Sequence, residues 1–356
     1  MTADIKARDI KIATFNLCNF IEPPSAFYDF ENIYTDEQWQ KKQQWIVSYL
    51  EQYQPDVIGF QEVFSAKALQ ALVKRADYPY FAVIDKPQPI EDYIYQSPVV
   101  AIASKYPIHE VSGVAPTDLA IQLNDASETP FGFSRQPLRA TIAVPELGMC
   151  DFYVVHFKSK RPMLNDECEP QSTVASNNDE RKLNALKSLR HEVLGSWASS
   201  CQRGSEAAYL LDAILCRKFE NNYPAILMGD FNDDLNTGVL SHLLTHSTRQ
   251  LSEDENKQFL AGYQLKDSWA LFTAGQEINA CDAPSISAPF TYYYGARGSR
   301  LDYILLSSEF DPNYPENLAE VHGYHVHDKH LINPSYEVDS FSTDHAIVMI
   351  SLRIRH

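Results

Sequence analysis

The sequence predicts an α/β protein whose chemistry lies at the ends of buried strands. Short apolar runs, such as residues 225–228 and 346–350, have the length and composition of buried strands. Two longer segments carry helix-capping signals and apolar residues suited to helices. Polar side chains that can take part in hydrolysis stand directly at the ends of the strands, and they recur from one end of the chain to the other.

The strand predicted at residues 225–229 ends in two polar residues. Asp230 and Asn232 stand at positions i and i+2, so on an extended backbone they project from the same face. A carboxylate and a carboxamide held side by side can polarise a water molecule and hold an oxyanion. Asp344 and His345 stand directly before the apolar run 346–352. Such a pair can offer one side chain to a metal and the other to a phosphate or a proton transfer.

Four further predicted strands carry a polar residue at one terminus. The strands are residues 10–15, 56–61, 152–155 and 301–306, and the polar residues are Asn16, Glu62, His156 and Asp302. Chance alone would place one or two such residues at strand ends. Six strands with this feature therefore predict one rim at which the strand ends converge.

The residue types at this rim narrow the chemistry. Glu62, Asp344 and Asn16 offer hard oxygen atoms, which suit Mg²⁺ or Mn²⁺ better than Zn²⁺. The remaining residues divide into candidate acid–base groups, Asp230 and His156, and candidate stabilisers of phosphoryl oxygens, Asn232 and His345. The glycine motifs of nucleotide-fuelled enzymes, dinucleotide-binding folds and serine hydrolases are absent from the sequence, so those activities are unsupported.

Helices are predicted in two places. Thr35 or Asp36 can cap a helix over residues 37–52. A second helix is predicted from residues 178–179 to about residue 199, and Gly204 with the following serine predicts a break before a further helix that ends near residue 221.

The bulk properties favour one domain over residues 1–356, because a boundary between residues 16 and 345 would divide the rim. The chain has no run of eighteen apolar residues, so we expect no stable membrane insertion. The N-terminus lacks a secretory signal and the six cysteines lack a C-x-x-C pair, which predicts reduced thiols and a cytoplasmic location. No feature indicates an obligate protein partner.

The charge is strongly negative, with 30 basic and 47 acidic residues and a net charge of −17. Residues 131–161 differ, because they carry Arg135, Arg139, Lys158, Lys160 and Arg161 against two acids. The segment 291–301 adds two more arginines and no acid. Both segments flank rim residues, which predicts a basic pocket suited to a local phosphate rather than to a long duplex. Arg135, Lys158 and Lys160 are the candidate substrate-binding residues.

Two clusters of residues have a structural interpretation as well as a functional one. The histidines at 322, 325, 327 and 330 invite a second metal site, but the charged residues beside them favour exposed surface histidines. The run Tyr292-Tyr293-Tyr294 suits base stacking, but it also suits a packed strand, which we favour.

The ordered set of motifs resembles the endonuclease/exonuclease/phosphatase superfamily. The motifs are Phe15-Asn16, Gln61-Glu62, His156, Gly229-Asp230-Phe231-Asn232, Arg300-Leu301-Asp302-Tyr303 and Thr343-Asp344-His345. The resemblance implies a four-layer α/β sandwich of two packed, mainly antiparallel sheets flanked by helices. It also implies hydrolysis of phosphoesters with a divalent metal. The stretch Phe157-Lys158-Ser159-Lys160 is most similar to that of bacterial nuclease-type members.

The resemblance also assigns roles to the rim residues. It implies that Glu62 is the main metal ligand, assisted by Asn16 and Asp344. It implies that Asp230 orients or deprotonates the attacking water, with Asn232 beside the phosphate. It further implies that His345 faces the scissile phosphate, supported by Asp302, and that His156 completes the site.

Three functions follow as expectations. The first is a Mg²⁺-dependent nuclease or small phosphodiesterase acting on a phosphoester substrate, with nucleic acid as one class. The second is a phosphomonoesterase acting on a small molecule such as a phosphoinositide or a nucleotide. The third is a non-catalytic binding module, against which the complete set of rim residues argues.

Overall fold

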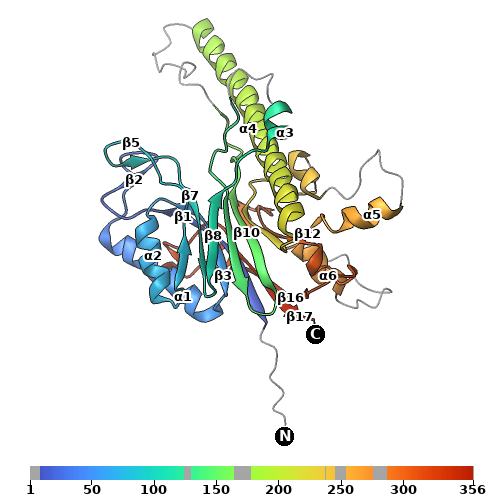
Figure 1. Ribbon diagram of the computed structural model, residues 1–356. Helices are drawn as coiled ribbons and strands as arrows, with labels where there is room; N and C mark the ends of the chain where they lie inside the picture. Colours follow the sequence, from blue (N-terminus) through green and yellow to red (C-terminus); the bar gives the residue numbers. More distant parts are fainter. Residues whose placement is uncertain are drawn as a thin grey trace.

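The computed structural model describes residues 9–123, 130–163, 178–236, 238–244, 254–275 and 287–355. Two six-stranded sheets form its centre (Figure 1). In spatial order the first sheet contains β16 (Ala319–His327), β17 (Ile347–Ile354), β1 (Ile10–Phe20), β3 (Val57–Val63), β7 (Val99–Ser104) and β4 (Tyr80–Ala82). The second contains β12 (Leu265–Asp267), β15 (Asp302–Ser307), β11 (Ala225–Asp230), β10 (Gly148–His156), β9 (Leu138–Val144) and β8 (Ile108–Gly113).

Both large sheets are mainly antiparallel. Their parallel pairs are β1 with β3 and β10 with β11. Small sheets add β13 (Tyr292–Tyr294) with β14 (Arg297–Ser299), and β2 (Ala26–Phe27) with β6 (Ile94–Tyr95) and β5 (Pro89–Glu91). All six strands predicted from the sequence are present. The strand predicted at residues 10–15 continues to Phe20, so Asn16 lies within it rather than after it.

Helices cover the outer faces of the sandwich (Figure 1). The helices α1 (Asp36–Tyr53) and α2 (Ala66–Arg75) pack on the first sheet, whereas α4 (Asn178–Asn221) and the 3-10 helix η2 (Gly238–Leu244) pack on the second. The remaining helical elements are α3 (Asp118–Leu123), α5 (Asp254–Ala261), α6 (Ser268–Gly275), η3 (Ser308–Phe310), α7 (Lys329–Ile332) and α8 (Tyr336–Asp339). The predicted four-layer sandwich is confirmed.

The layering explains why the central strands are apolar on both faces. In β11, Ile226 and Met228 join the core between the two sheets, while Ala225 and Leu227 join the core under α4. Successive side chains of a strand point to opposite faces, so a strand covered on both sides becomes a continuous apolar run. The polar residues of the rim lie at or near the ends of such strands.

The helix starts follow the sequence signals, but one predicted break does not occur. Thr35 caps α1 through a capping box, in which Thr35 Oγ1 accepts from the Gln38 backbone and Gln38 Oε1 accepts from the Thr35 backbone. The break predicted at Gly204 is wrong, because α4 runs through it to Asn221. A Cβ atom on Gly204 would lie 3.1 Å from the Cβ of Val239, so this glycine allows η2 to approach the helix closely.

Among the described residues, no helix is long and apolar enough to cross a membrane. The four described cysteines, Cys18, Cys150, Cys201 and Cys216, are all free.

Candidate active site

Strand pairing brings the predicted rim residues together. In the second sheet Asp230 is the register partner of both His156 and Asp302. In the first sheet Asn16 and Glu62 lie near the same ends of two parallel strands. Asn16 Nδ2 donates to Asp230 Oδ2 at 3.2 Å, which joins the rims of the two sheets across 214 residues of sequence. The convergence predicted from the strand ends is confirmed.

The backbone is irregular where these side chains emerge. Glu62 and Asn232 both have positive φ, of 59° and 55°. Such values cost a non-glycine residue roughly 1–3 kcal/mol, and they re-aim the side chain relative to a regular strand. Only glycine fits at position 229, where φ is 153°, because a Cβ atom there would lie 2.0 Å from the Val155 carbonyl oxygen. Backbone strain is thus concentrated at the rim.

The carboxylate of Asp230 is buried and held by three donors. Its Oδ1 accepts from the Asn232 backbone at 2.9 Å, and its Oδ2 accepts from the side-chain amides of Asn16 at 3.2 Å and Asn232 at 3.3 Å. Burial raises the pKa of Asp230 to about 7, with His345 opposing the shift and Asp302 adding to it. A carboxylate with a pKa near neutrality is suited to accept a proton at physiological pH.

His345 lies between two carboxylates. Its Nδ1 donates to Asp302 Oδ2 at 2.8 Å, and its Nε2 lies 3.9 Å from Asp230 Oδ2. Burial disfavours the imidazolium, but Asp302 and Asp230 outweigh that cost and raise the pKa of His345 well above its usual range. The arrangement holds a charged histidine in a fixed orientation, as stabilisation of a phosphoryl oxygen requires.

Hydrogen bonds from neighbouring segments hold the loop that carries His345 in place. Thr343 Oγ1 donates to the Asn16 carbonyl at 2.7 Å, and the buried Lys42 donates to the Ser342 carbonyl at 2.9 Å. His330 Nε2 donates to the carbonyl of His345 at 3.0 Å. The interpretation of His330 as a surface histidine is therefore wrong, because its side chain is buried where it can make this bond. Asp328 and Lys329 precede His330 in the sequence, and these charged residues give no indication of the contact.

His156 is buried beside Asp230, with its Nε2 3.6 Å from Asp230 Oδ2. Burial, with Arg135, His345 and Lys158 adding to it, lowers the pKa of His156 well below its usual range. Its Nδ1 has no hydrogen-bond partner among the described residues.

These residues line a cavity of about 390 Å³, and its lining includes two further carboxylates, Glu62 and Asp344, which we call the acidic wall. Glu62 Oε2 accepts from the Asn19 backbone at 2.9 Å. Burial raises the pKa of the neighbouring Cys18 to about 12, with Asp344 and Glu62 adding to the shift. Two hard carboxylates in one cavity fit a divalent cation such as Mg²⁺. Asn16 is placed differently, since its amide nitrogen holds Asp230 and its oxygen accepts from the Cys18 backbone.

Asp230, Asp302 and His345 also offer ligand atoms within 4.8 Å of one another, the one group of this kind in the described part of the chain. Spacing alone would allow a metal among them. His345 Nδ1 and Asp302 Oδ2 are hydrogen-bonded to each other at 2.8 Å, and this bond competes with a metal for both atoms.

The lining of the cavity is also basic. Four cationic side chains line it, namely Arg135, Lys158, Lys160 and Arg161, and we call these four residues the basic wall. The predicted basic pocket is thus present, with three exceptions, of which Arg297 is exposed on β14. Arg139 points away and pairs with Glu110 at 2.5 Å, and Arg300 is buried in a bidentate pair with Asp267 at 2.6 and 2.7 Å. Both arginines form ion pairs that stabilise the fold, and neither lines the cavity.

Two aromatic residues also line the cavity, neither of which the sequence singled out as a site residue. Tyr28 lines it with φ of 62°, and the guanidinium of Arg161 lies 5.7 Å from its ring centroid. Tyr292 also lines it, with its ring 5.1 Å from that of His345, whereas Tyr294 is 78 % exposed. The interpretation of this tyrosine run as a packed strand is wrong for Tyr294. Tyr28 lies in the aromatic stretch of residues 20–34, which the sequence places at the rim because it follows Asn16.

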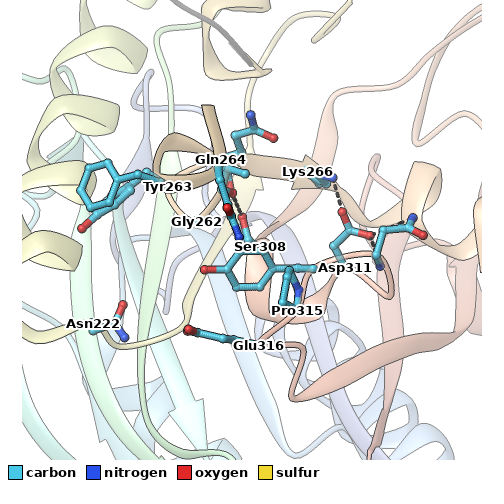
Figure 2. Close-up of a pocket in the computed structure, with 14 residues that line it drawn as sticks. Asn222, Gly262, Tyr263, Gln264, Lys266, Ser308, Asp311, Pro315 and Glu316 are labelled. Atoms are coloured by element: carbon cyan, nitrogen blue, oxygen red, sulfur yellow. Dashed lines mark hydrogen bonds and ion pairs between the residues drawn. The ribbon is translucent and has the colours of Figure 1, made fainter. Parts of the chain in front are cut away.

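A second cavity of about 600 Å³ lies away from the rim (Figure 2). Tyr263, Tyr314 and Glu316 line it, together with Lys266, which pairs with Asp311. It lacks the convergent carboxylates and histidines of the rim. Size therefore does not identify the active site in this protein, and the chemistry of the lining side chains does.

The pKa of Asp230 leads to a prediction about pH. We expect kcat/KM to fall as the pH drops below about 7, because protonated Asp230 cannot accept a proton. Stability should change in the opposite sense. The folded protein binds this proton more tightly than the unfolded chain, so stability should decrease as the pH rises from the ordinary value of 3.8 to about 7. Melting temperatures across this range will test it, and the slope should be smaller in Asp230→Asn.

The two-sheet sandwich and its rim of carboxylates, histidines and cations define a protein of the deoxyribonuclease-I-like class. The chain belongs to the Endonuclease/Exonuclease/phosphatase family, whose model matches residues 13–345. Members of this family are hydrolytic phosphoesterases that generally use divalent metals. No curated protein matches the chain in sequence.

Solved structures share the fold at low sequence identity. The human Nocturnin catalytic domain with bound sulfate is 15 % identical, with a TM-score of 0.54, over 98 % of this chain and 95 % of that one. A humanised D. rerio TDP2 is 16 % identical, with a TM-score of 0.51, over 97 % and 99 %. A family protein from Leptotrichia buccalis is 16 % identical, with a TM-score of 0.50, over 98 % and 100 %.

Proposed function

We propose that this protein is a divalent-metal-dependent hydrolase of phosphodiester bonds, of the nuclease or small phosphodiesterase type. One observation carries the proposal. The buried carboxylate of Asp230, with its pKa near 7, lies at a cavity whose lining includes both carboxylates and cationic side chains. The carboxylates suit a metal, the cations suit a phosphate, and Asp230 supplies a base in the same cavity.

In this proposal each side chain of the rim has a distinct role in hydrolysis. Glu62 and Asp344 would hold Mg²⁺ or Mn²⁺, which supplies Lewis-acid polarisation of the phosphate. Asp230 accepts the proton of the attacking water, while Asn16 and Asn232 keep its carboxylate in place. The imidazolium of His345, held by Asp302, stabilises negative charge on the phosphoryl oxygens. Asn16 as a direct metal ligand stays a prediction.

The basic wall favours a diester over a monoester. It holds four cations, of which Lys160 pairs with Asp233 at 2.8 Å. The other three carry more positive charge than is needed to neutralise one phosphate group. A substrate with neighbouring phosphates can therefore contact more of these cations. A short footprint also suits the net charge of −17, which disfavours an extended contact with nucleic acid. A cytoplasmic location, which the free cysteines suit, is part of the same proposal.

Two chromogenic esters provide the test. With Mg²⁺ or Mn²⁺ present, we expect hydrolysis of bis-p-nitrophenyl phosphate and much slower hydrolysis of p-nitrophenyl phosphate. The reverse preference would establish the phosphomonoesterase alternative, for which phosphoinositides and nucleotides are the substrates to try. Absence of hydrolysis across nucleic acids and small phosphoesters, with either metal, would indicate the non-catalytic alternative.

A further inference from the structure

Two charged side chains of α4 are buried beside the cavity without lining it. Arg203 and Glu206 are 2 % and 1 % exposed, and because they stand three positions apart they lie on the same face of the helix. Burial of a charged group is unfavourable unless the group is paired and hydrogen-bonded. Neither residue takes part in the hydrolysis proposed above, so their hydrogen-bond partners indicate what the two charges do.

The carboxylate of Glu206 joins two segments of the basic wall. Its Oε1 accepts from the Ser134 backbone at 2.7 Å, and its Oε2 accepts from the Lys158 backbone at 2.7 Å. Ser134 directly precedes Arg135, and both segments lie outside the strands. Backbone N–H groups in such segments lack the partners that a sheet supplies, and hydrogen bonds to a carboxylate are among the stronger ones. Glu206 thus fixes the backbone at two of the four cations.

Arg203 binds the basic wall at two further points. Its Nη1 donates to the Lys158 carbonyl at 3.1 Å, so one turn of α4 binds both backbone groups of Lys158. Its Nη2 donates to Asp233 Oδ2 at 2.8 Å, and Asp233 Oδ1 pairs with Lys160 Nζ at 2.8 Å. Asp233 therefore connects the buried guanidinium of Arg203 to the side chain of Lys160.

The same face of α4 also holds the fourth cation. Ser199 stands four positions before Arg203 and is buried, and its Oγ donates to the Arg161 carbonyl at 2.5 Å. All four residues of the basic wall are therefore tied to one face of this helix. The connection runs through the backbone of the cation itself, through the preceding residue or through Asp233.

A wall that is fixed before the substrate arrives binds it at lower cost. Long cationic side chains lose rotamer freedom when they contact a phosphate, and prior ordering of the backbone that carries them reduces this loss. We infer that Arg203 and Glu206 are positioning residues, which hold the basic wall in the arrangement that binds the phosphates of the substrate. The inference rests on the proposed function, because it takes the basic wall as the substrate-binding surface.

The location of these bonds predicts which kinetic constant depends on them. The side chains at the reacting end, Asp230 and His345, are held by Asn16, Asn232 and Asp302 instead. Loss of the bonds from α4 should therefore weaken substrate binding more than it slows the chemical step. In Glu206→Gln, KM for a phosphodiester should rise by about tenfold, and kcat should change much less.

A binding measurement tests the inference directly. Glu206→Gln keeps the shape of the side chain, but its amide nitrogen cannot accept from a backbone N–H, so one of the two bonds is lost. The probe is a fluorescein-labelled pentanucleotide of single-stranded DNA, titrated by fluorescence anisotropy with Mg²⁺ present. Every protein in the titration also carries Asp230→Asn, so that the probe is not hydrolysed. We expect Kd to rise about tenfold, because ordering a long side chain on binding costs up to about that factor.

Two comparisons separate positioning from general stability. Glu220→Gln makes the same chemical change at an exposed position of α4 and should bind like the parent. The second comparison adds Glu206→Gln to the double variant Arg135→Gln/Lys158→Gln. There it should weaken binding by less than about twofold, because the side chains that it positions are absent. A general loss of structure would weaken binding equally in both backgrounds.

Three outcomes would overturn the inference: the parent does not bind the probe, Glu206→Gln binds like the parent, or its effect is the same in both backgrounds. Melting curves establish that each variant is folded. If Glu206→Gln does not fold, Arg203→Lys takes its place, because lysine lacks the planar fork that spans Lys158 and Asp233. That variant should bind about threefold more weakly, and parent-like binding would also overturn the inference. These titrations do not depend on turnover, so failure of the proposed hydrolysis would leave their result intact.

Discussion

Asp230→Asn is expected to lower kcat by about a thousandfold, or about 4 kcal/mol of transition-state stabilisation. The carboxylate is the group with a pKa near 7 at the cavity, and an amide in its place cannot accept a proton. The substitution keeps the shape of the side chain, so KM should change much less than kcat. Steady-state kinetics on a phosphodiester, together with a melting curve, will measure both effects.

The neighbouring Asp234 provides the control. It is exposed, and its carboxylate accepts from the Asn236 backbone at 2.7 Å rather than facing the rim. Asp234→Asn should therefore retain nearly all the activity of the parent. If Asp230→Asn melts like the parent and keeps most of its kcat, Asp230 has a structural role and the proposed assignment of the base is wrong.

Glu62→Gln is expected to have the second-largest effect, through the metal. The substitution retains an oxygen that can accept from the Asn19 backbone, but it removes the negative charge from the acidic wall. We expect the Mg²⁺ concentration needed for half-maximal activity to rise about a hundredfold or more, and activity to vanish in excess EDTA. A Mg²⁺ titration of the rate, repeated with Mn²⁺, measures the change.

Glu22→Gln is the matched control, since Glu22 is exposed on the segment that follows β1. It should leave the Mg²⁺ requirement unchanged. Full turnover of the parent protein in EDTA would show that hydrolysis does not need the metal. An unaltered Mg²⁺ requirement in Glu62→Gln would show that the metal is held elsewhere.

The sequence alone was sufficient for the strands, and the family resemblance of its motifs implied the sandwich. Short apolar runs such as 225–228 fit a strand that is covered on both faces of its sheet. The capping box at Thr35 is recognisable from the sequence because its hydrogen bonds join residues only three positions apart. Rim residues could be found because polar groups tolerated at the ends of such strands stand out against the apolar background. The family resemblance then ordered them into one site.

Local signals failed where a distant partner decides the outcome. Gly204 reads as a helix break, but packing against Val239 makes it a point of close approach within α4. Arg139 and Arg300 read as pocket cations, but carboxylates brought near by the fold turn them away from the cavity. His330 reads as a surface residue until the loop of His345 is placed above it.

The sequence therefore determined which chemical groups the protein has and at which strand ends they stand. Only the tertiary structure decided their protonation, orientation and partners. A pKa near 7 for Asp230 requires burial and the approach of Asp302 and His345 from other parts of the chain. Electrostatic energy and packing depend on distances in space, and those distances join residues that lie hundreds of positions apart in the chain.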